Sequence, residues 1–267
     1  MSLFDAAHTA LMQPDPEAKV AAARDLEAAW RRGDLTTPSR SASPRPVPAP
    51  GRPDRPALVR PRELVQRRLN TPEGRAALVH AVAHIEFNAI NLALDAVYRF
   101  RDMPEAFYGD WFQVAAEEAS HFSMLRARLI ELGFDYGDFP AHNGLWEMAV
   151  ETADDVLVRM ALVPRVLEAR GLDVTPGMIE RLERAGDTAT VEILRVILRE
   201  EIGHVAIGSR WYLHACEQRG LDPVSTFVGL LETAMRGRVK PPFHRDARLQ
   251  AGFSAEELDR LEALAAP

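Results

Sequence analysis

Two pairs of residues in the sequence repeat a spacing that is typical of metal ligands. Glu118 is followed three positions later by His121, and Glu201 is followed three positions later by His204. On a helix, side chains three positions apart lie on nearly the same face, so each glutamate and its histidine can reach one ion. One such pair arises easily by chance in a glutamate-rich chain. Two pairs, on two segments with helical patterns, favour a metal site.

Each pair also has a glutamate upstream that could complete its ligand set. Glu86 lies 32 residues before Glu118, and Glu168 lies 33 residues before Glu201. The near-equal separations suggest a duplicated helical hairpin, in which residues at equal distances from the turn lie at the same height. The midpoint of each glutamate pair falls where the helical pattern breaks, at residue 102 and between residues 184 and 185.

The candidate ligands lie among apolar residues at helical spacing, so we expect them to be buried. A buried carboxylate costs several kcal/mol unless it is paired or binds a cation. Two divalent ions would meet this need, because four carboxylates nearly neutralise their charge. The alternative is a set of buried ion pairs with arginine, but such pairs would not explain the repeated Glu-x-x-His spacing. Glu151 or Asp155 could replace Glu168, which lies near a predicted helix end. The expected metal ligands are Glu86, Glu118, His121, Glu168, Glu201 and His204.

Other residues near these positions could support the metal site or serve as alternative ligands. Four of them could flank the ligands or contact them: His80, His84, Glu117 and Glu200. His80 and His84 are also alternative ligands because they are four positions apart, whereas the two glutamates fit a solvated face equally well. Tyr98 and Tyr212 could relay an electron or a radical, although a tyrosine between helices more often packs there.

The chain has helical patterns from Thr71 onward and no strand pattern. Helices are expected at about residues 71–100, 104–132, 145–170, 176–186 and 187–219. Pro164 should kink the third helix and Gly171 should end it. Residues 63–222 are therefore predicted to form an all-α, antiparallel four-helix bundle. Ferritin-like bundles that hold two iron or manganese ions use the same ligand set. In them, two helices each supply one glutamate and two other helices each supply a Glu-x-x-His pair.

The two ends of the chain differ from this bundle. Residues 1–62 are expected to form an amphipathic helical piece ending near Gly33, followed by an arm rich in proline, serine and arginine. Proline disfavours helix, so the arm should be extended, either as a flexible linker or as a strap across the bundle. Residues 223–267 read as a tail with one short helix, Ser254–Ala265.

Composition limits the compartment and the partners. The 267 residues carry a formal net charge of −7, so wholesale binding to nucleic acid or to an anionic membrane is not expected. The ten arginines between residues 31 and 68 could still steer a nucleic acid or another anion. Cys216, expected to be buried, is the single cysteine, which excludes disulfides and thiolate clusters within one chain. With no signal-peptide pattern and no run of about 18 apolar residues, we expect a soluble protein of the reducing cytoplasm.

Several stretches of the sequence resemble a known family. They are HAVAHIEFNAINLALD, AAEEASHF, VLEARGLDVTP, REEIGHVAIGSRW and PPFHRDARLQAGFSAEEL. From Arg62 to Leu264 the chain resembles the ferritin-like family catalogued as domain of unknown function 455. The resemblance implies the bundle and the metal site but supplies no reaction. More distantly, the ligand pattern is similar to those of bacterioferritins, rubrerythrins, ribonucleotide reductase small subunits and non-haem di-iron tRNA hydroxylases.

Three functions follow from these expectations. The first is an oxidoreductase that uses two iron ions, or manganese or a mixed pair, to activate O₂ or a peroxide and to oxidise an unknown small substrate, with an unknown electron donor. The second is a ferroxidase or iron-storage protein, although about 70 additional N-terminal residues and a long tail would crowd a storage cage. The third is a metal-free structural bundle. No membrane is expected as a partner, and a homodimer is left open.

Overall fold

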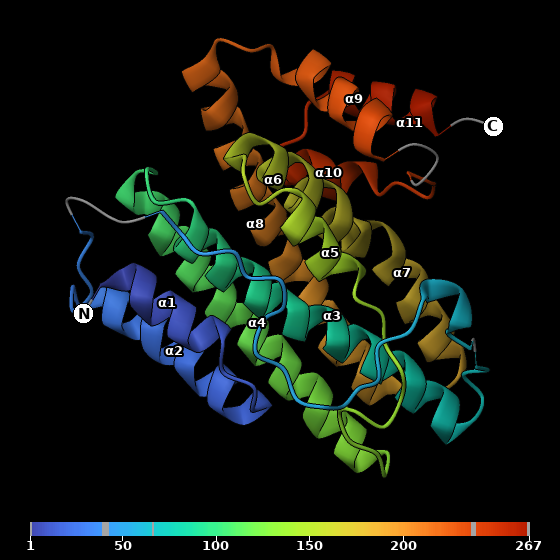
Figure 1. Ribbon diagram of the computed structural model, residues 1–267. Coiled ribbons are helices and arrows are strands. Elements are labelled where there is room, and N and C mark those ends of the chain that lie inside the picture. The colour runs from blue at the N-terminus through green and yellow to red at the C-terminus, as the bar shows by residue number, and fades with distance from the viewer. Residues whose placement is uncertain (1, 39–42, 66, 236–238, 266–267) are drawn as a thin grey trace. The chain divides into compact units, whose positions relative to one another are not determined.

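The computed structural model describes residues 2–38, 43–65, 67–235 and 239–265 (Figure 1). The described residues form helices and loops with no β-strand, which confirms the all-α prediction, and two isolated bridges are the only strand-like pairings among them. The chain divides into two compact units, Met1–Val150 and Glu151–Pro267. The predicted bundle of residues 63–222 includes parts of both units, and its assembly as one bundle stays a prediction.

The first unit is built around a long helical hairpin. Helices α3 (Pro72–Arg99) and α4 (Glu105–Glu131) pack along each other as consecutive antiparallel helices (Figure 1). Two shorter helices, α1 (Leu3–Leu11) and α2 (Pro16–Arg31), cover them, with α1 against α3 and α2 against α4. Helix α5 (Gly144–Glu151) ends the unit. Where the sequence predicted one N-terminal helical piece, the structure has two helices.

Local sequence explains where α3 begins and why it is buried. The Thr71 side chain accepts a hydrogen bond from the backbone N–H of Gly74 at 3.0 Å, and Pro72 occupies the first helical position, where no N–H is needed. The helix is apolar around most of its circumference, and by length and composition it could span a membrane. In the structure 78% of that apolar window is buried inside the protein, as in a core helix.

The proline-rich arm is a strap on the first unit. The N–H of Gly51 donates to the carbonyl oxygen of Leu11 at 3.0 Å, and Ala141 donates to Ala57 at 3.0 Å. The indole N–H of Trp146 donates to the carbonyl oxygen of Pro48 at 3.1 Å. Of the two alternatives for the arm, these bonds favour the strap over the flexible linker. One of the ten arginines, Arg40, lies outside the described residues.

The second unit contains another long hairpin, and its first arm differs from the prediction. Helix α6 (Val156–Leu162), the π-helical turn η2 (Val163–Glu168) and helix α7 (Ala169–Arg184) follow one another without interruption. A three-residue turn then leads into α8 (Thr188–Arg219), which ends at Gly220 in the left-handed conformation, as expected.

Three predictions about this arm were wrong. The helix expected over residues 145–170 is divided, because α5 ends at Glu151 and α6 begins only at Val156. Gly171 does not end a helix, and Pro176 does not begin one, because both lie inside α7. A glycine and a proline in a helix interior cost about 1 and 3 kcal/mol. Burial of Leu172 and Leu182, on a helix that packs against α8, offsets this cost.

The described residues of the C-terminal tail, 223–235 and 239–265, contain three helices where one was predicted. They are α9 (Pro223–Ala234), α10 (Arg245–Gln250) and α11 (Ala255–Leu264), the last of which was the predicted one. Helix α9 was missed although it has a clear start, since the Asp222 side chain accepts a hydrogen bond from Ser225 N–H at 2.8 Å. Helix α10 has six residues and is too short to show a period in the sequence.

Candidate metal centre

Three of the predicted ligands, the first triad, come together in the first unit. Glu86 projects from α3, and Glu118 and His121 project from α4; one ligand atom from each lies within 4.8 Å of the others. Nδ1 of His121 lies 3.3 Å from Oε2 of Glu86 and 3.4 Å from Oε2 of Glu118. The imidazole nitrogen therefore sits between two carboxylates from neighbouring helices.

The hairpin places these residues at one height. Helix α3 ends at Arg99 and α4 begins at Glu105, so the turn is centred on residue 102, as the sequence predicted. Glu86 and Glu118 are each 16 residues from that centre. The short turn and two regular helices are thus sufficient to bring the carboxylates together.

Burial and proximity alter the protonation of the first triad. Burial, reinforced by the charge of Glu118, raises the pKa of Glu86 to about 8. Burial alone would lower the pKa of His121, but hydrogen bonds to Glu118 and Glu86, together with their charges, raise it to about 11. Two acidic groups this close and this deeply buried need a cation, and either a proton or a metal ion can supply it.

The other three predicted ligands, the second triad, lie in the second unit. Glu168 is the last residue of η2, and Glu201 and His204 lie on α8; all three are buried. Nδ1 of His204 is 3.5 Å from Oε1 of Glu201. Within the described part of the chain, Oε2 of Glu201 is buried and accepts no hydrogen bond. A buried carboxylate oxygen in this state is suited to a cation.

The alternatives to Glu168 have other roles. Asp155 caps α6 by accepting a hydrogen bond from Leu157 N–H at 2.8 Å, and it also pairs with Arg219 at 2.7 Å. The partnership with Arg219 lowers the pKa of Asp155. Glu151 is exposed at the end of α5. Glu168 is therefore the best candidate for the third position of the second triad.

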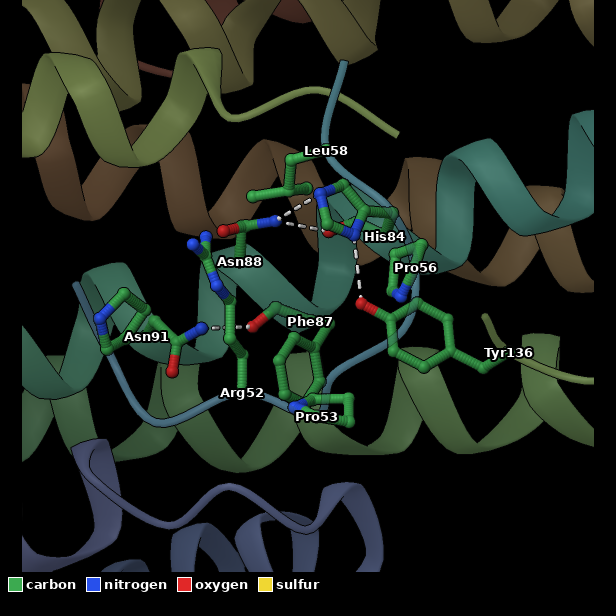
Figure 2. A pocket seen from close by; sticks show the side chains of 10 residues that line it. Arg52, Pro53, Pro56, Leu58, His84, Phe87, Asn88, Asn91 and Tyr136 are labelled. Carbon is green, nitrogen blue, oxygen red and sulfur yellow. Dashed lines mark hydrogen bonds between the residues drawn. The ribbon is translucent and has the colours of Figure 1, made fainter. Parts of the chain in front are cut away.

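His80 and His84 hold the loop that follows α4. Nε2 of His80 accepts a hydrogen bond from the N–H of Gly137 at 2.9 Å. Nδ1 of His84 is 2.9 Å from the Tyr136 hydroxyl (Figure 2). Its Nε2 is 3.1 Å from the carbonyl oxygen of His142. Burial lowers the pKa of each histidine to about 4. Both are thus neutral and engaged with the loop, which argues against their role as ligands.

The remaining candidates contact surface or backbone groups. Glu117 accepts a hydrogen bond from Gln113 at 2.9 Å, and Glu200 pairs with Arg199 at 2.9 Å; both glutamates are partly exposed. The hydroxyl of Tyr98 accepts a hydrogen bond from the Arg45 N–H at 2.8 Å, and that of Tyr212 donates to the carbonyl oxygen of Pro223 at 2.6 Å. Cys216 is buried and free, as expected. These contacts favour structural roles for all five.

Sequence reasoning missed Arg165, which lies three residues before Glu168 in η2. Its guanidinium is fully buried, with Nη2 2.7 Å from Oε1 of Glu257 in α11. The partners are 92 residues apart, and no local pattern links them. This ion pair connects the C-terminal tail to the π-helical turn that carries the second triad's Glu168.

Comparison with known proteins gives a family but no activity. Residues 12–259 match the family described as "Protein of unknown function (DUF455)". The chain is also similar to an "Uncharacterized protein" of Haemophilus influenzae, with 52% identity over 214 residues, which cover 78% of this chain and 74% of that protein. No solved structure matches the chain.

Proposed function

We propose that this chain, which belongs to the family described as "Protein of unknown function (DUF455)", is a metalloprotein that binds two divalent ions, iron or manganese, on its first and second triads. The observation that carries the proposal is the convergence of Glu86, Glu118 and His121 on one buried point of the first unit. The second triad supports it by repeating the same residue types on another hairpin. The two-ion assignment follows the ligand pattern of ferritin-like bundles.

The chemistry of the donors fits these metals. Each triad offers two carboxylates and one imidazole, a mixed oxygen and nitrogen set that suits iron and manganese, and neither contains the thiolate that softer ions prefer. Two carboxylates also match the charge of one divalent ion, so a filled triad carries no net charge. A bound ion therefore offsets the free-energy cost of burying the two carboxylates. Without metal, the first triad lowers this cost only by binding protons, as the raised pKa values of Glu86 and His121 indicate.

We assign the protein to oxidation chemistry in preference to storage. Two ferrous ions, when bound, supply the electrons with which O₂ or a peroxide is reduced while a substrate is oxidised. The residues of this chain hold the ions and balance their charge, with each histidine as a neutral anchor. The substrate is a small molecule and the electron donor is a separate partner. The reducing cytoplasm, in which ferrous iron persists, is the expected compartment.

A ferroxidase or storage role is the second candidate, because it would use the same ligands. Helices α1 and α2 and the strap cover the first hairpin, and surfaces covered in this way are not open for assembly into a closed cage. Light scattering of the purified protein distinguishes the two, since a monomer or dimer fits the enzyme and a large hollow shell fits storage.

Metal binding itself is tested by titration. Protein titrated with Fe(II) without oxygen, then desalted, should retain about two ions per chain. Glu118→Gln, which removes one ligand charge at constant size, should lower this number. Glu117→Gln is the matched control, because that side chain is partly exposed and bonded to Gln113, and it should leave the number unchanged. Folded wild-type protein that retains no metal would overturn the proposal.

A further inference from the structure

The π-helical turn of the second unit approaches α8 at a glycine. A Cβ built on Gly208 would lie 2.3 Å from Cβ of Pro164 and 2.4 Å from its Cγ. Real Cβ atoms do not come within 3.0 Å of other heavy atoms, and the proline ring cannot rotate away as a flexible side chain could. The observed packing of η2 on α8 therefore requires glycine at position 208.

Pro164 also accounts for the irregular turn. Proline lacks an N–H, and in an α-helix its ring clashes with the carbonyl oxygen four residues earlier. The chain continues here as a π-helical turn, Val163–Glu168, which opens the backbone around the ring. A π-helical turn adds one residue to the helix, and one residue corresponds to about 100° of rotation. The direction in which Glu168 projects therefore depends on this turn.

The same contact fixes the height of Glu168. The turn between α7 and α8 is centred on residue 186, and Pro164 and Gly208 are each 22 residues from that centre. Glu168 and His204 are each 18 residues from it. The position of the turn and the Pro164–Gly208 contact therefore indicate the same alignment of the two arms of the hairpin. In this alignment Glu168 lies at the same height as His204. The contact lies four residues from this level on α8, about 6 Å along the helix axis.

We infer that Pro164 and Gly208 are positioning residues of the second triad. Their close approach sets the spacing between η2 and α8, and the π-helical turn sets the rotation, so that Glu168 reaches the ion held by Glu201 and His204. The inference rests on the proposed function, because it assumes that the second triad binds an ion. It assigns a role to two residues that carry no donor group.

Two alanine substitutions on α8 test the inference with Mn(II) as the probe. Gly208→Ala should retain one tight ion and weaken the other about 10–100-fold, the loss expected when a residue that orients a ligand is removed. Gly203→Ala is the control, because an added Cβ there has no atom within 4 Å and the site is exposed. Gly203 is adjacent to His204, so proximity alone would predict the opposite ranking of the two variants.

Pro164→Ala tests the other residue of the contact. It removes the ring that opens the backbone into the π-helical turn, so the rotation of Glu168 should change and the same ion should be weakened. The free Mn(II) signal in electron paramagnetic resonance gives both affinities, and thermal melting confirms the fold. Pro164→Ala also decides the question if Gly208→Ala does not fold, because it removes atoms from the contact with Gly208 and adds none.

The outcomes are distinct. If Gly208→Ala binds both ions as the wild type does, or if folded Pro164→Ala does so, the positioning role is wrong while the proposed function stands. If the folded wild type binds no Mn(II) and no Fe(II), the proposed function fails, and this inference fails with it.

Discussion

Neutralising Glu257 should destabilise the second unit by several kcal/mol. Its carboxylate pairs with Arg165 at 2.7 Å, and the two side chains are 3% and 0% exposed. Three aromatic rings lie around the guanidinium, with centroids 4.3–4.5 Å from its central carbon: those of Tyr212, Phe227 and Phe253. Water cannot replace Glu257 in this enclosure, so the variant leaves a buried cation without a counter-charge.

The magnitude follows from the burial of both partners. Burial lowers the pKa of Arg165 although the charge of Glu257 opposes this, which shows how strongly the surroundings disfavour the cation. Removing one member of a buried ion pair costs about 3–5 kcal/mol. We choose Glu257→Gln because glutamine keeps the size of the side chain and an oxygen that can accept the Ser254 N–H, now bonded at 2.8 Å. The loss then reports the charge rather than the helix cap.

Urea unfolding monitored by circular dichroism measures the effect. Glu256→Gln on the same helix is the control, because its partner Arg260 is 3.9 Å away and both are exposed, and such pairs contribute about 0–1 kcal/mol. A loss below about 1 kcal/mol for Glu257→Gln would refute the reasoning, because it would mean that Arg165 finds another counter-charge. Replacing both partners, as Arg165→Met with Glu257→Leu, should restore most of the stability.

Two further predictions concern single residues. His121→Ala and His204→Ala should each lose one metal ion and keep the other in the Fe(II) titration, because a histidine is a monodentate ligand; if both variants keep two tight ions, these histidines are not the anchors. Burial lowers the pKa of Lys19 from 10.5 to about 7, so between pH 7 and pH 10.5 the unfolded chain binds more protons than the folded chain. The free energy of unfolding of the wild type should therefore rise with pH in this range, by at most about 1.4 kcal/mol per pH unit. Lys19→Met should lack this rise, and an identical pH dependence in both proteins would show that the oxygen acceptors of Leu11, Gly51 and Asn91 keep the ammonium charged.

The first hairpin was largely predictable because its information is local. The cap at Thr71 and the break near residue 102 can each be recognised from a few adjacent residues, and the segments on either side of the break are regular helices. With the turn located, the helical period alone brings Glu86 level with Glu118. Spacing along the chain was therefore sufficient to predict the first triad.

The second unit was harder because its determinants are distant in sequence. Gly171 and Pro176 are helix breakers by local rules, yet packing against α8 overrides them. The pairing of Arg165 with Glu257 spans 92 residues, so the tail could not be recognised as part of the fold. Helix α9 has a local start signal, but the prediction treated the region as a tail and gave that signal too little weight.

The two hairpins also show that equal spacing along a chain does not imply equal register. Glu86 and Glu118 are equidistant from their turn, whereas in the second hairpin Glu168 is equidistant with His204 and not with Glu201. The midpoint predicted between residues 184 and 185 therefore misses the true centre at residue 186. An undistorted copy of the first hairpin would not produce this offset. The π-helical turn at Pro164 changes the rotation of Glu168 at its new height, so similar donor sets can arise from two different backbone solutions.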